Sequence, residues 1–99
     1  MKQYTTPLIS MRVSGQALAM EAADRVVMAA KGQNGATVTW DGERLHIDND
    51  VVNVRLTEQE TADLEGTSDV EVTIFLGGNV YKTETMRMNI KKAVWDNGD

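Results

Sequence analysis

The 99-residue chain contains no cysteine, a single proline, and few aromatic residues, which make up 5% of the sequence. Without cysteine there are no disulfides, no thiol catalysis and no cysteine-based metal sites, a composition that suits a reducing compartment. No apolar run approaches the ~18 residues of a membrane-spanning helix. The first residues, Met1 to Thr6, lack the apolar segment of a signal peptide. We therefore expect neither membrane insertion nor secretion by a signal peptide.

Positive charge is also scarce. Ten Lys and Arg residues stand against 15 Asp and Glu residues, so the formal net charge is −5. Only Lys91 and Lys92 are adjacent in sequence, so no basic stripe is available for a nucleic-acid backbone. This balance argues against nucleic-acid and anionic-membrane partners. With 41% hydrophobic and 25% charged residues, the composition is that of one soluble folded domain.

What the sequence does contain is a series of short segments in which apolar and polar residues alternate, the pattern of strands with one buried face. We predict strands over residues 8–13, 25–31, 36–40, 44–47, 51–56, 70–76 and 80–90. Turn residues separate them, and Asn-Gly at 34–35 and Asp-Gly at 41–42 are both predicted to close hairpins. Trp40 is expected in the core. The last segment is predicted to be one continuous strand with Val80, Met86 and Ile90 in phase.

Two segments indicate helical structure. Residues 16–23 are rich in helix formers, and we predict a short helical or irregular connection there ahead of the strand at 25–31. A single helix over 17–31 is the alternative. Thr57 and Glu60 have the spacing of a capping box, which predicts a short helix over 58–64 that ends at Gly66 and crosses between sheets.

Together these segments predict an all-β fold. About seven short strands, one capped helical turn near 58–64 and no βαβ spacing are typical of an antiparallel, immunoglobulin-like β-sandwich. Residues 1–90 are expected to form this single domain. Residues 91–99 are expected to form a polar C-terminal tail.

Catalytic chemistry is not indicated by any motif. His46 is the single histidine and is expected to face solvent, opposite the inward Leu45 and Ile47. Nucleophilic catalysis requires a nucleophile beside a base, and the chain has neither a cysteine nor a G-x-S-x-G turn. We therefore predict no enzyme activity, no catalytic residue, no cofactor and no small-molecule substrate.

Four acidic residues, Asp41, Glu43, Asp48 and Asp50, surround two predicted turns. Acidic loops of this kind suit a weak calcium site, but the spacing of a calcium-binding EF-hand loop is missing. Two hairpin turns at one end of a sandwich explain the acids better, so no metal site is predicted.

Three aromatic residues, Phe75, Tyr81 and Trp95, are candidates for a partner surface. The alternation places Phe75 and Tyr81 opposite the buried positions of their strands, so they are expected to share an exposed face across the intervening glycine turn. The alternative is that they only cover the sheet. Trp95 lies in the polar tail, where it either packs against the sandwich or contacts a partner.

Three segments carry a family resemblance: T-T-P-L at 5–8, D-N-D-V-V-N-V-R-L at 48–56 and T-E-Q-E-T-A-D-L at 57–64. Over roughly residues 5–90 the chain resembles the immunoglobulin-like N-terminal domain of phage baseplate upper proteins, found in phages and prophages of Gram-positive bacteria. The resemblance implies a non-enzymatic structural or assembly protein of a tail or baseplate. Its partners would be other phage structural proteins or further copies of itself, in the virion or the host cytoplasm.

The alternative function is a carbohydrate- or cell-surface-binding sandwich. Such modules present exposed aromatic residues near acids or amides. The candidates here are Trp40, Phe75 and Tyr81, with the acids of the turns between 41 and 50.

Overall fold

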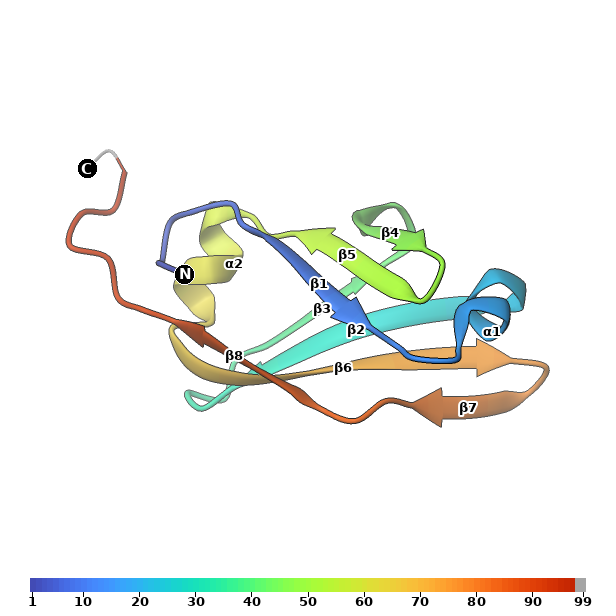
Figure 1. The fold of residues 1–99 in the computed structure, drawn as a ribbon. Helices are drawn as coiled ribbons and strands as arrows, with labels where there is room; N and C mark the ends of the chain where they lie inside the picture. Colours follow the sequence, from blue (N-terminus) through green and yellow to red (C-terminus); the bar gives the residue numbers. More distant parts are fainter. Residues whose placement is uncertain (98–99) are drawn as a thin grey trace.

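The computed structural model describes residues 1–97 and contains two antiparallel β-sheets packed face to face (Figure 1). The three-stranded sheet has the order β1-β5-β4 and comprises β1 (Leu8–Arg12), β4 (Leu45–Asp48) and β5 (Val51–Arg55). The five-stranded sheet has the order β3-β2-β6, with β7 and β8 both paired to β6. Its strands are β2 (Arg25–Gly32), β3 (Thr37–Asp41), β6 (Gly66–Leu76), β7 (Asn79–Lys82) and β8 (Met86–Ile90). The predicted all-β sandwich is confirmed.

Two α-helices and one 3₁₀ turn connect these strands: α1 (Ala17–Ala22), η1 (Gly42–Arg44) and α2 (Glu58–Asp63). The capping box of α2 is confirmed, because Glu60 N donates to Thr57 Oγ1 at 3.1 Å and Thr57 N donates to Glu60 Oε1 at 2.9 Å. As predicted, α2 carries the chain from β5 to β6, from one sheet to the other. No helix within residues 1–97 is long and apolar enough to cross a membrane.

The alternative of one helix over 17–31 is wrong, and the short helix followed by a strand is right. The chain leaves the helical conformation at Ala23, and Asp24 N donates to Phe75 O at 2.8 Å. From Arg25 onward, β2 lies between β3 and β6 and pairs with both. A central strand buries Met28 and Ala30 completely. This burial in a paired sheet outweighs the helix propensity of the segment.

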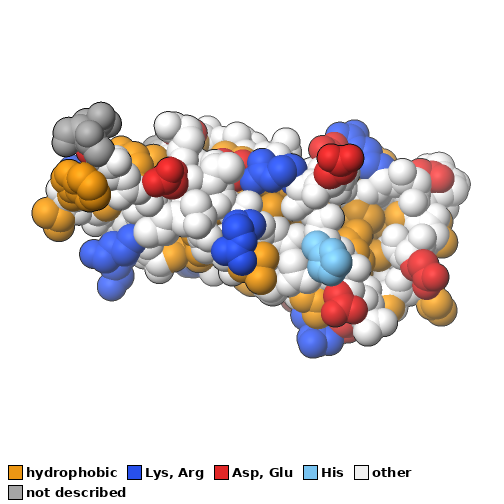
Figure 2. Space-filling model, turned by 90° about the horizontal axis from the view of Figure 1, so that it is seen from above, with side chains coloured by type: hydrophobic (Ala, Val, Ile, Leu, Met, Phe, Trp, Pro, Cys, Tyr) orange, Lys and Arg blue, Asp and Glu red, His pale blue; other side chains and the backbone are white. Residues whose placement is uncertain are grey.

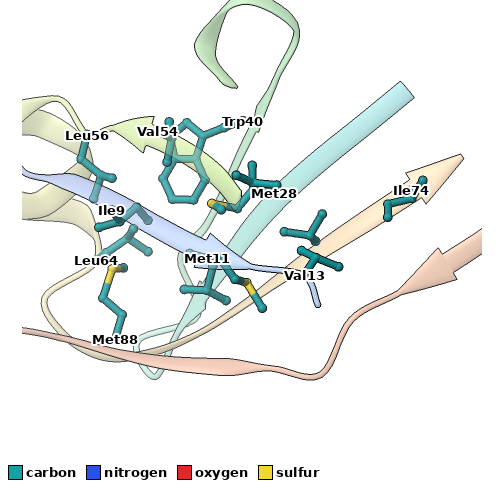
Figure 3. Close-up of a cluster of buried hydrophobic side chains, with 14 of the residues drawn as sticks. Ile9, Met11, Val13, Met28, Trp40, Val54, Leu56, Leu64, Ile74 and Met88 are labelled. Carbon is teal, nitrogen blue, oxygen red and sulfur yellow. The ribbon is translucent and has the colours of Figure 1, made fainter. Parts of the chain in front are cut away.

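The core fills the space between the two sheets. Trp40 and Met28 of the five-stranded sheet lie beside Val54 of the three-stranded sheet (Figure 3). One continuous cluster of buried residues joins both sheets and both helices, and it comprises Ile9, Met11, Val13, Met20, Met28, Ala30, Trp40, Val52, Val54, Leu56, Leu64, Val70, Val72, Ile74, Met88 and Ile90. The segments predicted as strands at 8–13, 51–56 and 70–76 therefore each bury one face, as their alternation predicts.

The predicted hairpin at Asp41-Gly42 is wrong. Here the chain crosses from β3 in the five-stranded sheet to β4 in the three-stranded sheet, and η1 makes the crossing. Gly42 takes a positive φ of 56°, which suits a sharp change of direction as well as a hairpin. Ile47 lies on the inner face opposite Val52. It is 36% exposed because β4 is an edge strand.

The predicted continuous strand over 80–90 is also wrong. Lys82 pairs with Thr73 and Met86 pairs with Val70, so three residues, 83–85, lie opposite two residues of β6. This extra residue is a β-bulge, which bends the strand and reverses the faces of the side chains beyond it. Val80, which pairs with Phe75, lies on the outer face and is 55% exposed, and the bulge puts Met86 out of phase with it.

Candidate interaction surface

The pairing of β6 with β7 places Phe75 and Tyr81 on opposite faces of the five-stranded sheet. Phe75 pairs with Val80 on the outer face, whereas Tyr81 pairs with Ile74 on the inner face. Residues directly opposite each other in an antiparallel pair share a face. The predicted shared face is therefore wrong, because it assumed that the alternation ran unbroken through residues 83–85.

Phe75 belongs to the outer surface of the sheet. Its ring lies under the guanidinium group of Arg25, 5.8 Å from the ring centroid, a geometry that favours a cation–π contact. Arg25 also forms an ion pair with Asp41 at 2.7 Å. Phe75 is half-buried by these neighbours, so it covers the sheet, which was the alternative interpretation.

Tyr81 lies beside a depression between the two sheets, which we call the groove. The volume of the groove is about 580 Å³, and its lining includes Met11, Val13, Ile74, Tyr81, Glu84 and Met86. Met11, Val13 and Ile74 are buried and form an apolar floor, while Tyr81 is 49% exposed. On one side lie the end of β1 and the turn after it, and on the other lie the bulge and the ends of β7 and β8. In the sequence, the charged Lys82 and Glu84 interrupt the apolar positions of an alternating segment, which indicates that this part of the strand lies at the rim of the sandwich. The groove itself depends on how the two sheets pack.

Charge at the groove is mostly neutralised by local ion pairs. Arg12 pairs with Asp50 at 2.6 Å, and Lys82 lies 3.4 Å from Glu71. Glu84 is exposed and takes part in none of the ion pairs found among residues 1–97. The rim therefore keeps one uncompensated negative charge.

The tail, here residues 91–97, is attached to the N-terminal segment. Lys2 and Lys91 form a parallel β-bridge, and Gln3 N donates to Lys91 O at 2.9 Å. Ala93 N donates to Gln3 Oε1 at 3.0 Å. Trp95 is nevertheless 64% exposed and Val94 is fully exposed, so these contacts leave both apolar side chains uncovered. Apolar side chains gather at this end of the molecule (Figure 2), whereas residues 98–99 of the predicted tail lie outside the described residues.

His46 faces solvent, as predicted. It lies opposite Asn53 on the outer face of the three-stranded sheet, and the histidine side chain is visible at the surface in pale blue (Figure 2). The four acids do not converge: Asp41 is on β3 and pairs with Arg25, whereas Asp50 pairs with Arg12 on the other sheet. Within residues 1–97 no group of three or more His, Asp or Glu side chains is placed to hold a metal ion.

The sequence does not predict the whole polar network around Glu60. Its Oε2 accepts from Nε1 of the buried Trp40 at 2.9 Å, and its Oε1 accepts from Arg44 at 2.7 Å. Partial burial alone would raise the pKa of Glu60, but hydrogen bonds from Arg44, Thr57 and Trp40 outweigh it, so this pKa is lowered. The sequence revealed the capping role of Glu60, but the contacts with Trp40 and Arg44 depend on the crossing between sheets.

Comparison with known proteins adds no relative. No protein-family model matches the chain, and a search of curated proteins found no match.

Proposed function

We propose that this chain is a non-enzymatic structural or assembly protein of a phage or prophage particle, an adaptor associated with the tail or baseplate. The resemblance in the segments at 5–8, 48–56 and 57–64 supports the phage context. The observation that carries the adaptor role is the exposed apolar surface at two places, Val80 and Tyr81 on β7 and Val94 and Trp95 in the tail. Exposed apolar side chains of this kind mark protein contacts.

Strand β7 has the features of a protein-binding edge. It pairs only with β6, and all four of its residues are exposed. Thr83 N donates to Val72 O on β6. Since hydrogen-bonding direction alternates along a strand, the backbone groups of Val80 and Lys82 point away from β6. An unpaired edge with apolar side chains accepts a strand from another chain.

Particle composition tests the function. The prophage of the source strain is induced, intact particles are purified, and mass spectrometry measures this chain against a major structural protein of the same particles. A stoichiometric amount is the expected result. A chain that is abundant in the lysate but absent from particles would contradict a virion role and leave only the assembly role.

A backbone variant tests the edge of β7 within the same particles. Val80→Pro removes one outward N–H and leaves the pairing with β6 intact, because proline is tolerated where the N–H faces away from the sheet. We expect it to lower incorporation into particles relative to Val80→Thr, which keeps the N–H. Equal incorporation of the two variants would show that this edge binds no partner.

Carbohydrate binding remains the second candidate function. Trp95 and Tyr81 are 64% and 49% exposed, as sugar stacking requires. The other aromatic candidates are less suited, because Trp40 is only 1% exposed and Phe75 lies under Arg25. A glycan array with and without calcium tests this function, and an array without binding would contradict it.

A further inference from the structure

The two exposed apolar features lie in different parts of an elongated molecule. The chain measures 47 × 22 × 19 Å, and the tail is at one end, whereas β7 is at the other (Figure 1). Hydrogen bonds to Gln3 hold the tail at its own end, so Trp95 does not reach the groove of its own chain. We propose that Trp95 of one copy inserts into the groove of a second copy. This inference rests on the assembly role proposed above, for which it names the partner.

The size and lining of the groove suit an indole side chain. Pockets of about 300–1,000 Å³ hold drug-sized ligands, so a groove of about 580 Å³ has room for Trp95 together with part of Val94. The floor of Met11, Val13 and Ile74 is apolar and the half-exposed Tyr81 forms one wall. Aromatic pairs and methionine–aromatic contacts both stabilise such an arrangement.

Charge favours the same pairing. The tail, residues 91–97, carries Lys91 and Lys92 against the single acid Asp96, and neither lysine takes part in an ion pair found among residues 1–97. The groove keeps the exposed Glu84, while its cations Arg12 and Lys82 are already paired with acids. The tail of one copy therefore brings positive charge to a rim that has an uncompensated negative charge. Such complementarity orients two partners.

The geometry of this contact has a consequence for assembly. The inserted residue and the groove lie at different places on the chain. Two copies that exchange tails reciprocally form a closed dimer, whereas a copy that gives its tail to one neighbour and its groove to another builds rings or open chains.

Sedimentation velocity of the full chain, from micromolar concentrations to about 1 mM, tests the proposal. We expect association that increases with concentration, to a dimer where the exchange is reciprocal and to larger species where it is not. Trp95→Ala should weaken association about thirty-fold, the typical effect of truncating a central interface tryptophan. Leu18→Ala is the matched control, because Leu18 is 80% exposed and lies outside both the tail and the groove. Far-ultraviolet circular dichroism verifies that every variant is folded.

A mixing experiment tests the direction of the contact. The double variant Tyr81→Ala/Glu84→Lys disables the groove and keeps the tail, whereas Trp95→Ala keeps the groove. At a concentration where each variant alone is monomeric, an equimolar mixture should form dimers but nothing larger.

Three results would overturn the inference: a wild-type chain that stays monomeric, Trp95→Ala that assembles like the wild type, or a mixture that forms no dimer. A monomeric chain that is nevertheless stoichiometric in particles would leave the proposed function standing and would assign the groove to another phage protein.

Discussion

At the residue scale, Glu60 does the most to connect separate parts of the molecule. Its two oxygens accept hydrogen bonds from the N-terminus of α2, from Arg44 of η1 and from Trp40 on β3. Arg44 in turn donates to Arg55 O at the end of β5 at 3.0 Å. The Glu60 carboxylate therefore stabilises the region where the chain crosses from one sheet to the other. These contacts favour the charged form of Glu60.

Replacing Glu60 by Gln should destabilise the fold and reduce its sensitivity to acid. Because its folded-state pKa is lowered, the stabilisation is fully present above the ordinary glutamate pKa. It is lost as pH falls through the folded-state pKa. We expect Glu60→Gln to cost about 1–2 kcal/mol at pH 7 and less at pH 3. Urea unfolding at both pH values measures this. Glu43→Gln, which changes an exposed acid, is the control, and an equal loss at both pH values would contradict the assignment.

Two buried hydroxyl groups should respond to mutation in opposite ways. Ser68 Oγ is buried and has no hydrogen-bond partner among residues 1–97, whereas Thr61 Oγ1 donates to Glu58 O at 2.9 Å or Thr5 O at 3.1 Å. An unsatisfied buried polar group costs free energy, and a satisfied one contributes it. We expect Ser68→Ala to leave stability unchanged or to raise it by up to about 1 kcal/mol, and Thr61→Val to lower it by about 1–2 kcal/mol. Thermal unfolding compares them, and a larger loss for Ser68→Ala would refute this.

At the element scale, the bulge at residues 83–85 decides which side chains the last part of the sheet exposes. Thr83 anchors it, since its Oγ1 accepts from Val72 N at 2.9 Å and its own N–H donates to Val72 O at 3.0 Å. The side chain thus replaces a backbone acceptor that the extra residue displaces. Because of this extra residue, Met86 lies on the inner face together with Tyr81.

Thr83→Val should loosen the bulge without unfolding the protein. The substitution keeps the shape of the side chain and removes the acceptor of Val72 N–H, which costs about 1 kcal/mol. We expect faster hydrogen exchange at the Val72 amide. Thr85→Val is the matched control, because no hydrogen bond of Thr85 is among those found for residues 1–97. Equal exchange at Val72 in both variants would show that the side chain does not anchor the bulge.

At the scale of the whole molecule, a single core joins both sheets. Trp40 is the largest fully buried side chain, and it contributes an apolar ring to the core and a hydrogen bond to Glu60. The chain ends are also joined, through the bridge between Lys2 and Lys91. Because the core is continuous, the sandwich should unfold as one cooperative unit.

Trp40→Phe should destabilise the whole sandwich, and Trp95→Phe should not. The first substitution leaves a cavity in the core and removes the donor to Glu60, a loss of about 2–4 kcal/mol. The second changes a side chain that is 64% exposed. Calorimetry and fluorescence give the two unfolding midpoints. The Trp95→Phe chain should also show blue-shifted emission that acrylamide quenches poorly, and similar midpoints for both variants would contradict the placement of the two tryptophans.

Much of the fold could be predicted from local pattern. Alternation located β1, β5 and β6 together with their inward residues, and the capping box located α2. Hydrophobic periodicity and turn chemistry act over a few residues, so they can be recognised in a single sequence. Residues 16–31 are also predicted correctly as a short helical connection followed by a strand. The helix propensity of this segment makes a single helix over 17–31 the alternative.

The candidate surface depended on contacts between segments far apart in the chain. Asp41-Gly42 has the chemistry of a hairpin, yet it crosses between sheets, because the partner of each strand is chosen by packing and by Arg44 bound to Glu60. One extra residue opposite β6 breaks the alternation between Tyr81 and Met86, so that both face inward, and alternation cannot reveal an extra residue without its partner strand. Local sequence therefore specified most of the strands and the buried faces of β1, β5 and β6. Strand pairing specified the groove and the exposed edge, because both arise where two sheets meet.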